Sequence, residues 1–424
     1  MNPTDPRDRV CLRSRLMYYL RMCCAVILAI MGLPAQAQTR LAFIDPLSGP
    51  FALTGELALR RLRDEVALRN ALPTAHNAWE VLALDNKGTV QESLIALRQA
   101  IDQDARLIVQ GQSSAVAHAL IEAINRHNER DPARAVLLLN YAATDPALTE
   151  ARCSFWHFRF DAHLGMRMEA LTAHIARTPE VKRVYLLVQD YAFGHEFARA
   201  ARALLALRRP DIQIVGEDRH ALGQVRDFAP YIAKIRAANA DTVLTGNWGP
   251  DLNLLVKAAR ESSSALRFYT FYAGSPGAVS AMGEAAAGRV IDVTDWHINA
   301  TTRAEQQRAE KFQARYGTDY HFARLHSLVQ MLHAATLQAQ STHALPIALA
   351  LENRRFKGET GEVQMRRFDH QLLMPLYIAE LAKREGTQVA SESSALAWRT
   401  LQTIPAYVAT QPTSCQLNRP SRLQ

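Results

Sequence analysis

The chain alternates short apolar runs with longer segments in which apolar residues recur every three or four positions, the spacing of an amphipathic helix. In the first half the predicted strands are 40–46, 79–85, 106–111 and 135–140, and the predicted helices are 53–70, 89–102 and 114–128. Consecutive parallel strands need such crossover helices, which cover both faces of their sheet. The pattern therefore predicts an α/β fold built on a parallel sheet.

A second series of the same kind follows. Its predicted strands are 183–190, 212–218, 241–246 and 266–273, and its predicted helices run to about 208 and over 227–238 and 250–261. Two such series predict two similar lobes, joined by the segment FWHFRFDAHLG at 155–165. Beyond them, 303–354 is predicted to be helical and 361–381 to form a terminal hairpin.

The first 37 residues differ from the rest. Five arginines and two acidic residues precede or flank the apolar run MCCAVILAIMGL, and small residues stand at Ala35 and Ala37. This order is typical of a cleaved secretory signal peptide (1–37), and about twelve apolar residues are too few for the roughly twenty that span a bilayer. The prediction is an exported protein. Loss of the segment lowers the formal charge from +8 to +5, and the remaining basic residues are dispersed, which argues against nucleic-acid binding.

Export also decides how the cysteines are interpreted. Three of the five lie in the signal segment, which leaves Cys153 and Cys415. Two cysteines in an oxidising compartment favour a disulfide. We therefore expect these two residues to join the C-terminal end of the chain to its middle.

Polar, glycine-rich turns follow the predicted strands. They are DPLSGPFALTG, GQSSA, NYAATDP, QDYAFGHE, GNWGPD and YAGSPG. Each is ordinary turn chemistry when taken alone. The carboxyl ends of parallel strands share one edge of a sheet, however, and open α/β sheets bind their ligands there. The six turns together predict a ligand site.

The turn GQSSA is open to two kinds of chemistry. Ser113 and Ser114 stand beside the N–H groups that begin the next helix, a combination that favours a carboxylate, unless one serine simply caps that helix. The same stretch is close to the Gly-x-Ser-x-Gly motif of serine hydrolases, with Ser113 in the nucleophile position and Ala115 replacing the second glycine. An exported serine hydrolase is therefore an alternative, weakened because no recognisable Asp and His motif follows at later strand ends.

The other turns supply further candidate ligand contacts. These are Ala142, Ala143 and Thr144 after the fourth strand, and Tyr191, Phe193 and Trp248 in the second series, where they would form an aromatic wall. Asp251 falls just inside a predicted helix. It either complements the helix dipole or pairs with a ligand ammonium group.

Metal and nucleotide chemistry has little support. The stretch HEFAR at 195–199 has Arg199 where a zinc motif needs a second histidine. Neither a Gly-x-Gly-x-x-Gly motif after the first strand nor a Walker motif is present. We expect no metal and no cofactor.

Six motifs in order, FIDPLSGPFALTG, VQGQSSAVAHAL, NYAATDPALT, FWHFRFDAHLG, VQDYAFGHEFARA and GNWGPDLNLLVKAA, resemble the exported solute-binding proteins of the branched-chain amino acid (Leu/Ile/Val) ABC transport family. The resemblance covers nearly the whole mature chain. It implies the type I periplasmic binding protein fold, in which two Rossmann-like lobes with parallel sheets are linked by three crossing segments. The crossings are expected near 158–161, 290–298 and 354–358. The implied N-terminal lobe is 38–158 plus 298–354, and the implied C-terminal lobe is 159–297 plus 355–424.

The resemblance also implies site roles. The carboxylate and ammonium of an amino acid would be held by the two turns of the first lobe, at Ser113, Ser114, Ala142, Ala143 and Thr144. Asp251 would complete the ammonium site, and Phe193 matches an aromatic position of the family. Phe193 lacks the hydroxyl of the tyrosine often found there, Thr54 stands where an aromatic residue often lines the pocket, and ALPTAHNAWE replaces the usual Gly-Gly loop.

The resulting prediction is a monomeric, non-catalytic, Venus-flytrap receptor of the periplasm. It would bind an amino acid or amide-like solute between its lobes and deliver it to the membrane permease of an ABC transporter. A ligand sensor with the same fold is a further alternative.

Overall fold

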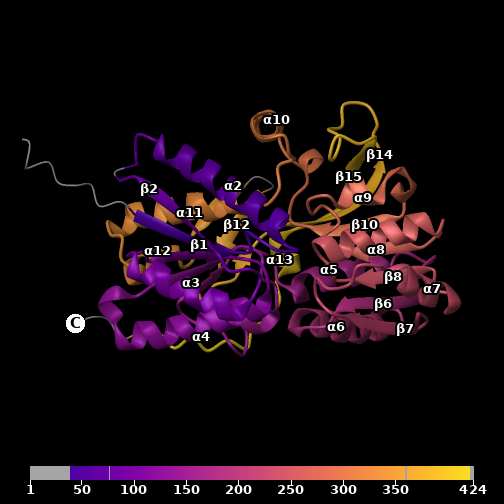
Figure 1. The fold of residues 1–424 in the computed structure, drawn as a ribbon, viewed down its shortest axis with the longest axis horizontal. Coiled ribbons are helices and arrows are strands. Elements are labelled where there is room, and N and C mark those ends of the chain that lie inside the picture. Colours follow the sequence, from indigo (N-terminus) through magenta and orange to yellow (C-terminus); the bar gives the residue numbers. More distant parts are fainter. Residues whose placement is uncertain (1–38, 76, 359–360, 421–424) are drawn as a thin grey trace, which may run out of the picture.

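The structure, a computed structural model, describes residues 39–75, 77–358 and 361–420. The predicted signal peptide (1–37) lies outside these residues. The described chain forms two lobes side by side, each a sheet covered by helices (Figure 1). Within the described residues, none of the helices is both long enough and apolar enough to cross a membrane.

The first lobe is built on a five-stranded parallel sheet in the order β2-β1-β3-β4-β5. Its strands are β1 (Thr39–Asp45), β2 (Trp79–Asp85), β3 (Leu107–Gln110), β4 (Leu137–Asn140) and β5 (His157–Arg159). Its helices are α2 (Ala52–Asn70), α3 (Val90–Asp102), α4 (Ser114–Arg130), α11 (Arg324–Ala339) and α12 (Ala344–Leu351). Alternate residues of β1 enter separate apolar cores on the two faces, Phe43 in one and Ile44 in the other. Burial on both faces explains why these strands are continuous apolar runs.

The second lobe is built on a seven-stranded sheet in the order β15-β14-β10-β9-β8-β6-β7. Its parallel strands are β6 (Arg183–Gln189), β7 (Gln213–His220), β8 (Thr242–Thr245), β9 (Arg267–Thr270) and β10 (Val290–Thr294), and its antiparallel edge is β14 (Leu376–Lys383) with β15 (Leu396–Ile404). Its helices are α5 (Leu164–Ile175), α6 (Ala192–Arg208), α7 (Ala229–Ala237), α8 (Pro250–Glu261) and α9 (Ala278–Met282). The predicted α/β fold with two parallel-sheet lobes is confirmed.

The predicted terminal hairpin over 361–381 is only partly right. β12 (Gly361–Met365) does pair with β13 (Leu372–Leu373), and β11 (Arg355–Gly358) completes a small three-stranded sheet. β14 instead joins the second lobe, where it pairs with β10 and with β15, a strand that the sequence pattern did not reveal. Pro375 stands between β13 and β14, and because proline has no N–H to donate it interrupts the ladder there.

The chain passes between the lobes after β5 and after β10, close to the expected positions. The third passage lies between β13 and β14, later than the expected 354–358. Residues 355–358 and 361–373 remain with the first lobe because Gln371 extends its sheet through a parallel bridge to Arg159, and the His370 ring stacks on Phe158 with centroids 3.9 Å apart. These contacts join residues more than 200 positions apart, so local sequence patterns do not show them.

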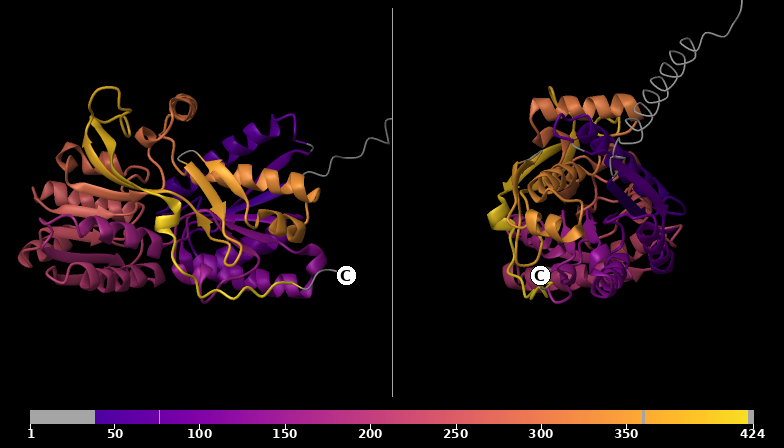
Figure 2. Two further views of the ribbon diagram at one scale, coloured as in Figure 1. Left: turned by 180° about the vertical axis from the view of Figure 1, so that it is seen from behind. Right: turned by 90° about the vertical axis from the view of Figure 1, so that its left-hand side faces the viewer.

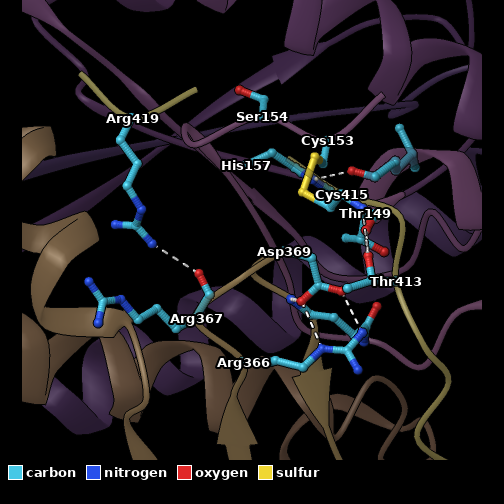
Figure 3. Close-up of a disulfide and its surroundings, with 12 residues drawn as sticks. Thr149, Cys153, Ser154, His157, Arg366, Arg367, Asp369, Thr413, Cys415 and Arg419 are labelled. Atoms are coloured by element: carbon cyan, nitrogen blue, oxygen red, sulfur yellow. Dashed lines mark hydrogen bonds and ion pairs between the residues drawn. A yellow bond between two sulfur atoms is a disulfide. The ribbon is translucent and has the colours of Figure 1, made fainter. Parts of the chain in front are cut away.

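The last described residues return to the first lobe. After β15 and the short helix α13 (Ala406–Ala409), the chain runs along the underside of the first lobe (Figure 2). There a disulfide joins Cys415 to Cys153, and Thr413 donates a hydrogen bond to the carbonyl of Thr149 at 2.9 Å (Figure 3). Arg419 also pairs with Glu352. The C-terminal segment is thus a fourth passage between the lobes, and a covalent bond holds its far end.

Candidate functional site

A cavity of about 160 Å³ lies between the two lobes. The strand-end turns and helix starts of the first lobe contribute Thr54, Gln112, Ser113, Ser114, Ala142, Ala143 and Thr144 to its wall. Those of the second lobe contribute Tyr191, Phe193, Trp248 and Tyr272. Eight of the nine residues predicted as candidate ligand contacts therefore line one cavity. The strands explain this gathering, since parallel strands end at a common edge.

The serine turn connects β3 to α4. Ser113 has φ 73° and ψ 113°, and its side chain makes no capping hydrogen bond to the helix that begins at Ser114. Ser113 therefore does not cap the helix through its side chain, which was one of the roles considered for the two serines. Ser114 Oγ accepts a hydrogen bond from the N–H of Asp145 at 3.3 Å, which links this turn to the next one. Ser113 and Ser114, at the start of α4, both line the cavity.

A buried carboxylate fixes the backbone just before the serines. Asp45, at the end of β1, accepts hydrogen bonds from Gly111 N at 3.1 Å, Gln112 N at 3.0 Å and the Tyr141 hydroxyl at 2.7 Å. Burial raises the pKa of Asp45 to about 7, although the donors act in the opposite direction. Gly111 has no space for a side chain, because a Cβ there would lie 2.6 Å from the Tyr141 ring.

The Ala-Thr turn after β4 is shaped by Asn140. Its Oδ1 accepts from Ala142 N at 3.1 Å and Ala143 N at 2.8 Å, and its Nδ2 donates to the Ala143 carbonyl at 2.9 Å. Both alanine amides are thus occupied within the first lobe. Ala142, Ala143 and Thr144 all line the cavity.

Two contacts at the cavity join the lobes directly. The hydroxyls of Thr144 and Tyr272 are hydrogen bonded at 3.0 Å, and the Phe51 ring packs on Trp248 with centroids 4.5 Å apart. Trp248 is held in place because its Nε1 donates to the Tyr191 hydroxyl at 2.8 Å. The structure therefore shows the lobes closed over the cavity.

Asp251 is the one predicted ligand residue that does not line the cavity. It is 1% exposed, and its Oδ2 accepts hydrogen bonds from Gln189 Nε2 at 2.7 Å and Gly223 N at 2.9 Å. In the structure it ties the end of β6 and a neighbouring loop to the first turn of α8. Its role toward a ligand ammonium group stays a prediction.

Other acidic residues do line the cavity, and sequence reasoning missed them. They are Asp292, Asp295, Glu310, Asp319 and Glu392. Asp292 accepts a hydrogen bond from Ala273 N at 3.2 Å, and burial raises its pKa to about 7. It stands inside β10, so a search of the turns after strands does not find it.

A buried charge cluster lies where the chain crosses between the lobes. Arg324, at the start of α11, contacts Asp295 after β10 at 2.6 Å and Asp161 after β5 at 3.4 Å. Arg167 of α5 contacts the same Asp161 at 2.5 Å. Although burial favours protonation, Arg324 and Arg167 hold the pKa of Asp295 below its usual range. The cluster joins three segments that are distant in sequence, so no local sequence motif predicts it.

The arrangement does not resemble a serine hydrolase triad. His118, the histidine nearest to Ser113 in sequence, is hydrogen bonded to Asp145 at 2.8 Å. Among the described residues, no histidine is hydrogen bonded to Ser113, and no group of three or more His, Cys, Asp or Glu side chains is arranged to hold a metal ion.

Comparison with known proteins fits this geometry. Residues 38–387 match the family model described as periplasmic binding protein. The chain belongs to the periplasmic binding protein family. The Leu/Ile/Val-binding protein homolog 4 of Brucella melitensis biotype 1 is 29% identical to it, over 94% of this chain and 97% of the relative. This confirms the family that the six motifs indicated.

Solved structures agree. This periplasmic binding protein superposes with a TM-score of 0.80 on the closed conformation of a leucine-, isoleucine-, valine-, threonine- and alanine-binding protein from Brucella ovis, at 29% identity over 90% of this chain and 100% of that one. The fold is also that of a solute-binding protein of an ABC transporter from Rhodopseudomonas palustris BisB5, solved with 3,4-dihydroxybenzoic acid, at a TM-score of 0.75 and 16% identity over 87% and 98% of the two chains.

Proposed function

We propose that this chain is the solute-binding component of an ABC importer and that it captures an amino acid in the cavity between its lobes. The observation that carries the proposal is the Thr144–Tyr272 hydrogen bond, which closes the lobes beside a cavity walled by the serine turn and the Ala-Thr turn. The names of its relatives, which describe Leu/Ile/Val binding, support the same ligand class.

The two turns of the first lobe suit the two charges of an amino acid. The Ser113 hydroxyl and the N–H groups at the start of α4 favour a carboxylate, which the partial positive charge of a helix N-terminus also stabilises. The Ala142 carbonyl and the Thr144 hydroxyl, on the neighbouring turn, suit an ammonium group. The rings of Trp248 and Phe193 face these turns from the second lobe and would cover the apolar part of the ligand.

The test is a ligand panel. The mature chain is heated with single amino acids, primary amides and aromatic acids in turn, and the melting temperature is recorded. A ligand that binds the folded state raises the melting temperature by mass action, so we expect a rise with amino acids and calorimetric binding of the same compounds. No response to any amino acid would contradict the proposal. Covalent labelling of Ser113 by a fluorophosphonate probe would favour the hydrolase instead.

Asp251 is tested separately. Asparagine at this position keeps a hydrogen-bond acceptor for Gly223 but has no negative charge. If the Asp251 carboxylate binds a ligand ammonium group, Asp251→Asn should abolish amino-acid binding and leave the circular dichroism spectrum unchanged. Undiminished affinity, measured by calorimetry, would restrict Asp251 to its contacts with Gln189 and Gly223.

The periplasmic location and the permease belong to the same proposal. We expect mass spectrometry of the exported protein to find Gln38 at its N-terminus, and we expect the protein to be monomeric in solution. Ligand-loaded protein should stimulate ATP hydrolysis by its reconstituted permease, whereas a receptor for a signalling partner would not.

A further inference from the structure

A phenylalanine of the first lobe packs into the second lobe. Phe51 immediately precedes α2, and its ring contacts the Trp248 ring with centroids 4.5 Å apart. Phe51 is 9% exposed, whereas Leu53, two positions further along in α2, is 54% exposed. The Phe51 ring is therefore buried where the two lobes meet.

Two glycines of the second lobe leave room for this ring. Gly223 lies in the loop between β7 and α7, and Gly249 lies between β8 and α8. A Cβ on Gly223 would lie 2.8 Å from Cε2 of Phe51, and a Cβ on Gly249 would lie 3.2 Å from its Cδ1. These two carbons stand on opposite sides of the ring, so the two loops enclose it between them. We call Trp248, Gly223 and Gly249 the Phe51 socket.

Hydrogen bonds hold the socket in shape. Trp248 Nε1 donates to the Tyr191 hydroxyl at 2.8 Å, and Gly223 N donates to Asp251 Oδ2 at 2.9 Å. Asp251 stands in the first turn of α8, two residues after Gly249, so its buried carboxylate connects the two glycine loops. The socket is thus preorganised to receive the ring.

The socket adjoins the ligand cavity. Trp248 and Gly249 line the cavity, whereas Phe51 is not among the described residues that form its wall. Separation of the lobes would withdraw the Phe51 ring from the socket and expose it to water, which opposes opening. Phe51 is therefore placed to act on lobe closure, and not on the ligand.

We infer that Phe51 is an interlobe latch, a residue that raises ligand affinity by stabilising the closed conformation and slowing ligand release. The inference rests on the proposed function, in which a ligand is captured between the lobes. Because a trapped ligand leaves only after the lobes separate, the latch acts chiefly on the dissociation rate. Because every ligand depends on the same closure, the latch changes all affinities by a similar factor.

The experiment measures calorimetric affinity and stopped-flow dissociation for leucine and threonine, with the mature wild-type protein and its variants. Phe51→Ala should weaken both ligands about tenfold, through faster dissociation, because the burial of the ring is lost. Leu53→Ala is the matched control and should change neither quantity, since this large apolar side chain is exposed. Phe51→Leu keeps part of the apolar volume and should lose less affinity. It takes the place of Phe51→Ala should that variant not fold.

Gly223→Ala tests the socket. Its Cβ would collide with the Phe51 ring, so this variant should also weaken both ligands. Gly223 has φ 68°, and the strain of an alanine at that angle is present with or without the ring. When combined with Phe51→Ala, which removes the collision, Gly223→Ala should have little further effect on affinity.

The outcomes separate the inference from the proposed function. If Phe51→Ala binds both ligands as tightly as the wild type, or if Gly223→Ala costs the same affinity with and without the ring, the inference is overturned while amino-acid binding stands. A loss confined to one ligand would also overturn it, because it would indicate direct contact with that ligand's side chain. If the wild-type protein binds no amino acid at all, the proposed function fails and the inference fails with it.

Discussion

At the scale of single residues, the site depends on groups placed under constraint. Ser113 has a backbone conformation that side chains rarely adopt, with φ 73°, yet its hydroxyl is not used to cap α4. Such strain costs on the order of 1–3 kcal/mol and persists where the surrounding structure enforces it. Here Asp45 enforces it by holding Gly111 and Gln112, immediately before the serine.

Ser113→Gly should therefore separate stability from binding. Glycine adopts positive φ without strain, so we expect the free energy of unfolding to rise by about 1 kcal/mol, while loss of the hydroxyl weakens ligand binding. Urea unfolding and calorimetry measure the two effects. Ser113→Ala, which removes the hydroxyl but keeps the Cβ, should weaken binding with no gain in stability. A fall in stability for the glycine variant would contradict the strain argument.

Asp45 should make stability depend on pH. Its folded pKa, raised to about 7, exceeds its ordinary value of 3.8, so the folded protein holds a proton that the unfolded chain has released. Its contribution to stability is therefore greatest below pH 4 and declines as pH rises toward 7. In Asp45→Asn we expect the free energy of unfolding to decline less between pH 5 and pH 8 than in the wild type. Urea unfolding at both values checks this, and identical slopes would contradict it.

At the scale of elements, each strand end builds its own turn. Asn140 is the last residue of β4 and forms hydrogen bonds with three backbone groups of the Ala-Thr turn. The serine turn follows the neighbouring strand, β3, and leads into α4. The turn residues form the cavity wall because β3 and β4 are hydrogen-bonded neighbours in register. Predicted ligand contacts that are about 30 residues apart in sequence are thus brought together by strand pairing.

Asn140→Ala should damage the fold and the site together. It leaves the amides of Ala142 and Ala143 without their acceptor, so we expect a loss of about 1–3 kcal/mol in the free energy of unfolding and weaker ligand binding. Asn128→Ala is the matched control. Asn128 is also buried, and its side chain forms hydrogen bonds with both the N–H and the carbonyl of Val136, at the opposite end of β4. It should lower stability similarly and leave affinity unchanged, and equal losses of affinity in both variants would contradict a local role for Asn140.

At the scale of the whole molecule, the lobes are joined by more than the three expected crossings. The segment after β15 returns to the first lobe and is fastened by the Cys153–Cys415 disulfide, whose ends are 262 positions apart in sequence (Figures 2 and 3). A cross-link over so long a stretch greatly restricts the unfolded chain. The disulfide also limits how far the C-terminal segment can move away from the first lobe.

Replacing both cysteines by serine should lower the free energy of unfolding by about 2–5 kcal/mol, because the unfolded chain regains its freedom. Urea unfolding with and without reductant measures the effect. Reductant should destabilise the wild-type protein to a similar extent and leave the double variant unchanged. If both thiols of the native protein react with an alkylating reagent before reduction, the disulfide is absent in solution.

Much of this organisation follows from local sequence. The 3.6-residue and continuous apolar patterns predict four strands of each lobe and most of the helices, because these patterns depend only on residues near in the chain. They do not predict β5, β10 or β15. The positions of the strand ends also predict the turns that line the cavity, which contain Gln112, Thr144 and Trp248. Export and the cysteine count predicted the pairing of Cys153 with Cys415, which the structure contains.

Tertiary structure decided which polar groups face the cavity and which serve the fold. Asp251 is held by Gln189 and Gly223, whereas Asp292 and Gln112 reach the cavity wall. It also decided that residues 361–373 stay with the first lobe, that Asp45 holds the serine turn, and that Arg324 joins the crossings. The physical reason is that a side chain's direction and partners are set by elements far away in sequence, whereas periodicity and turn chemistry are properties of neighbouring residues.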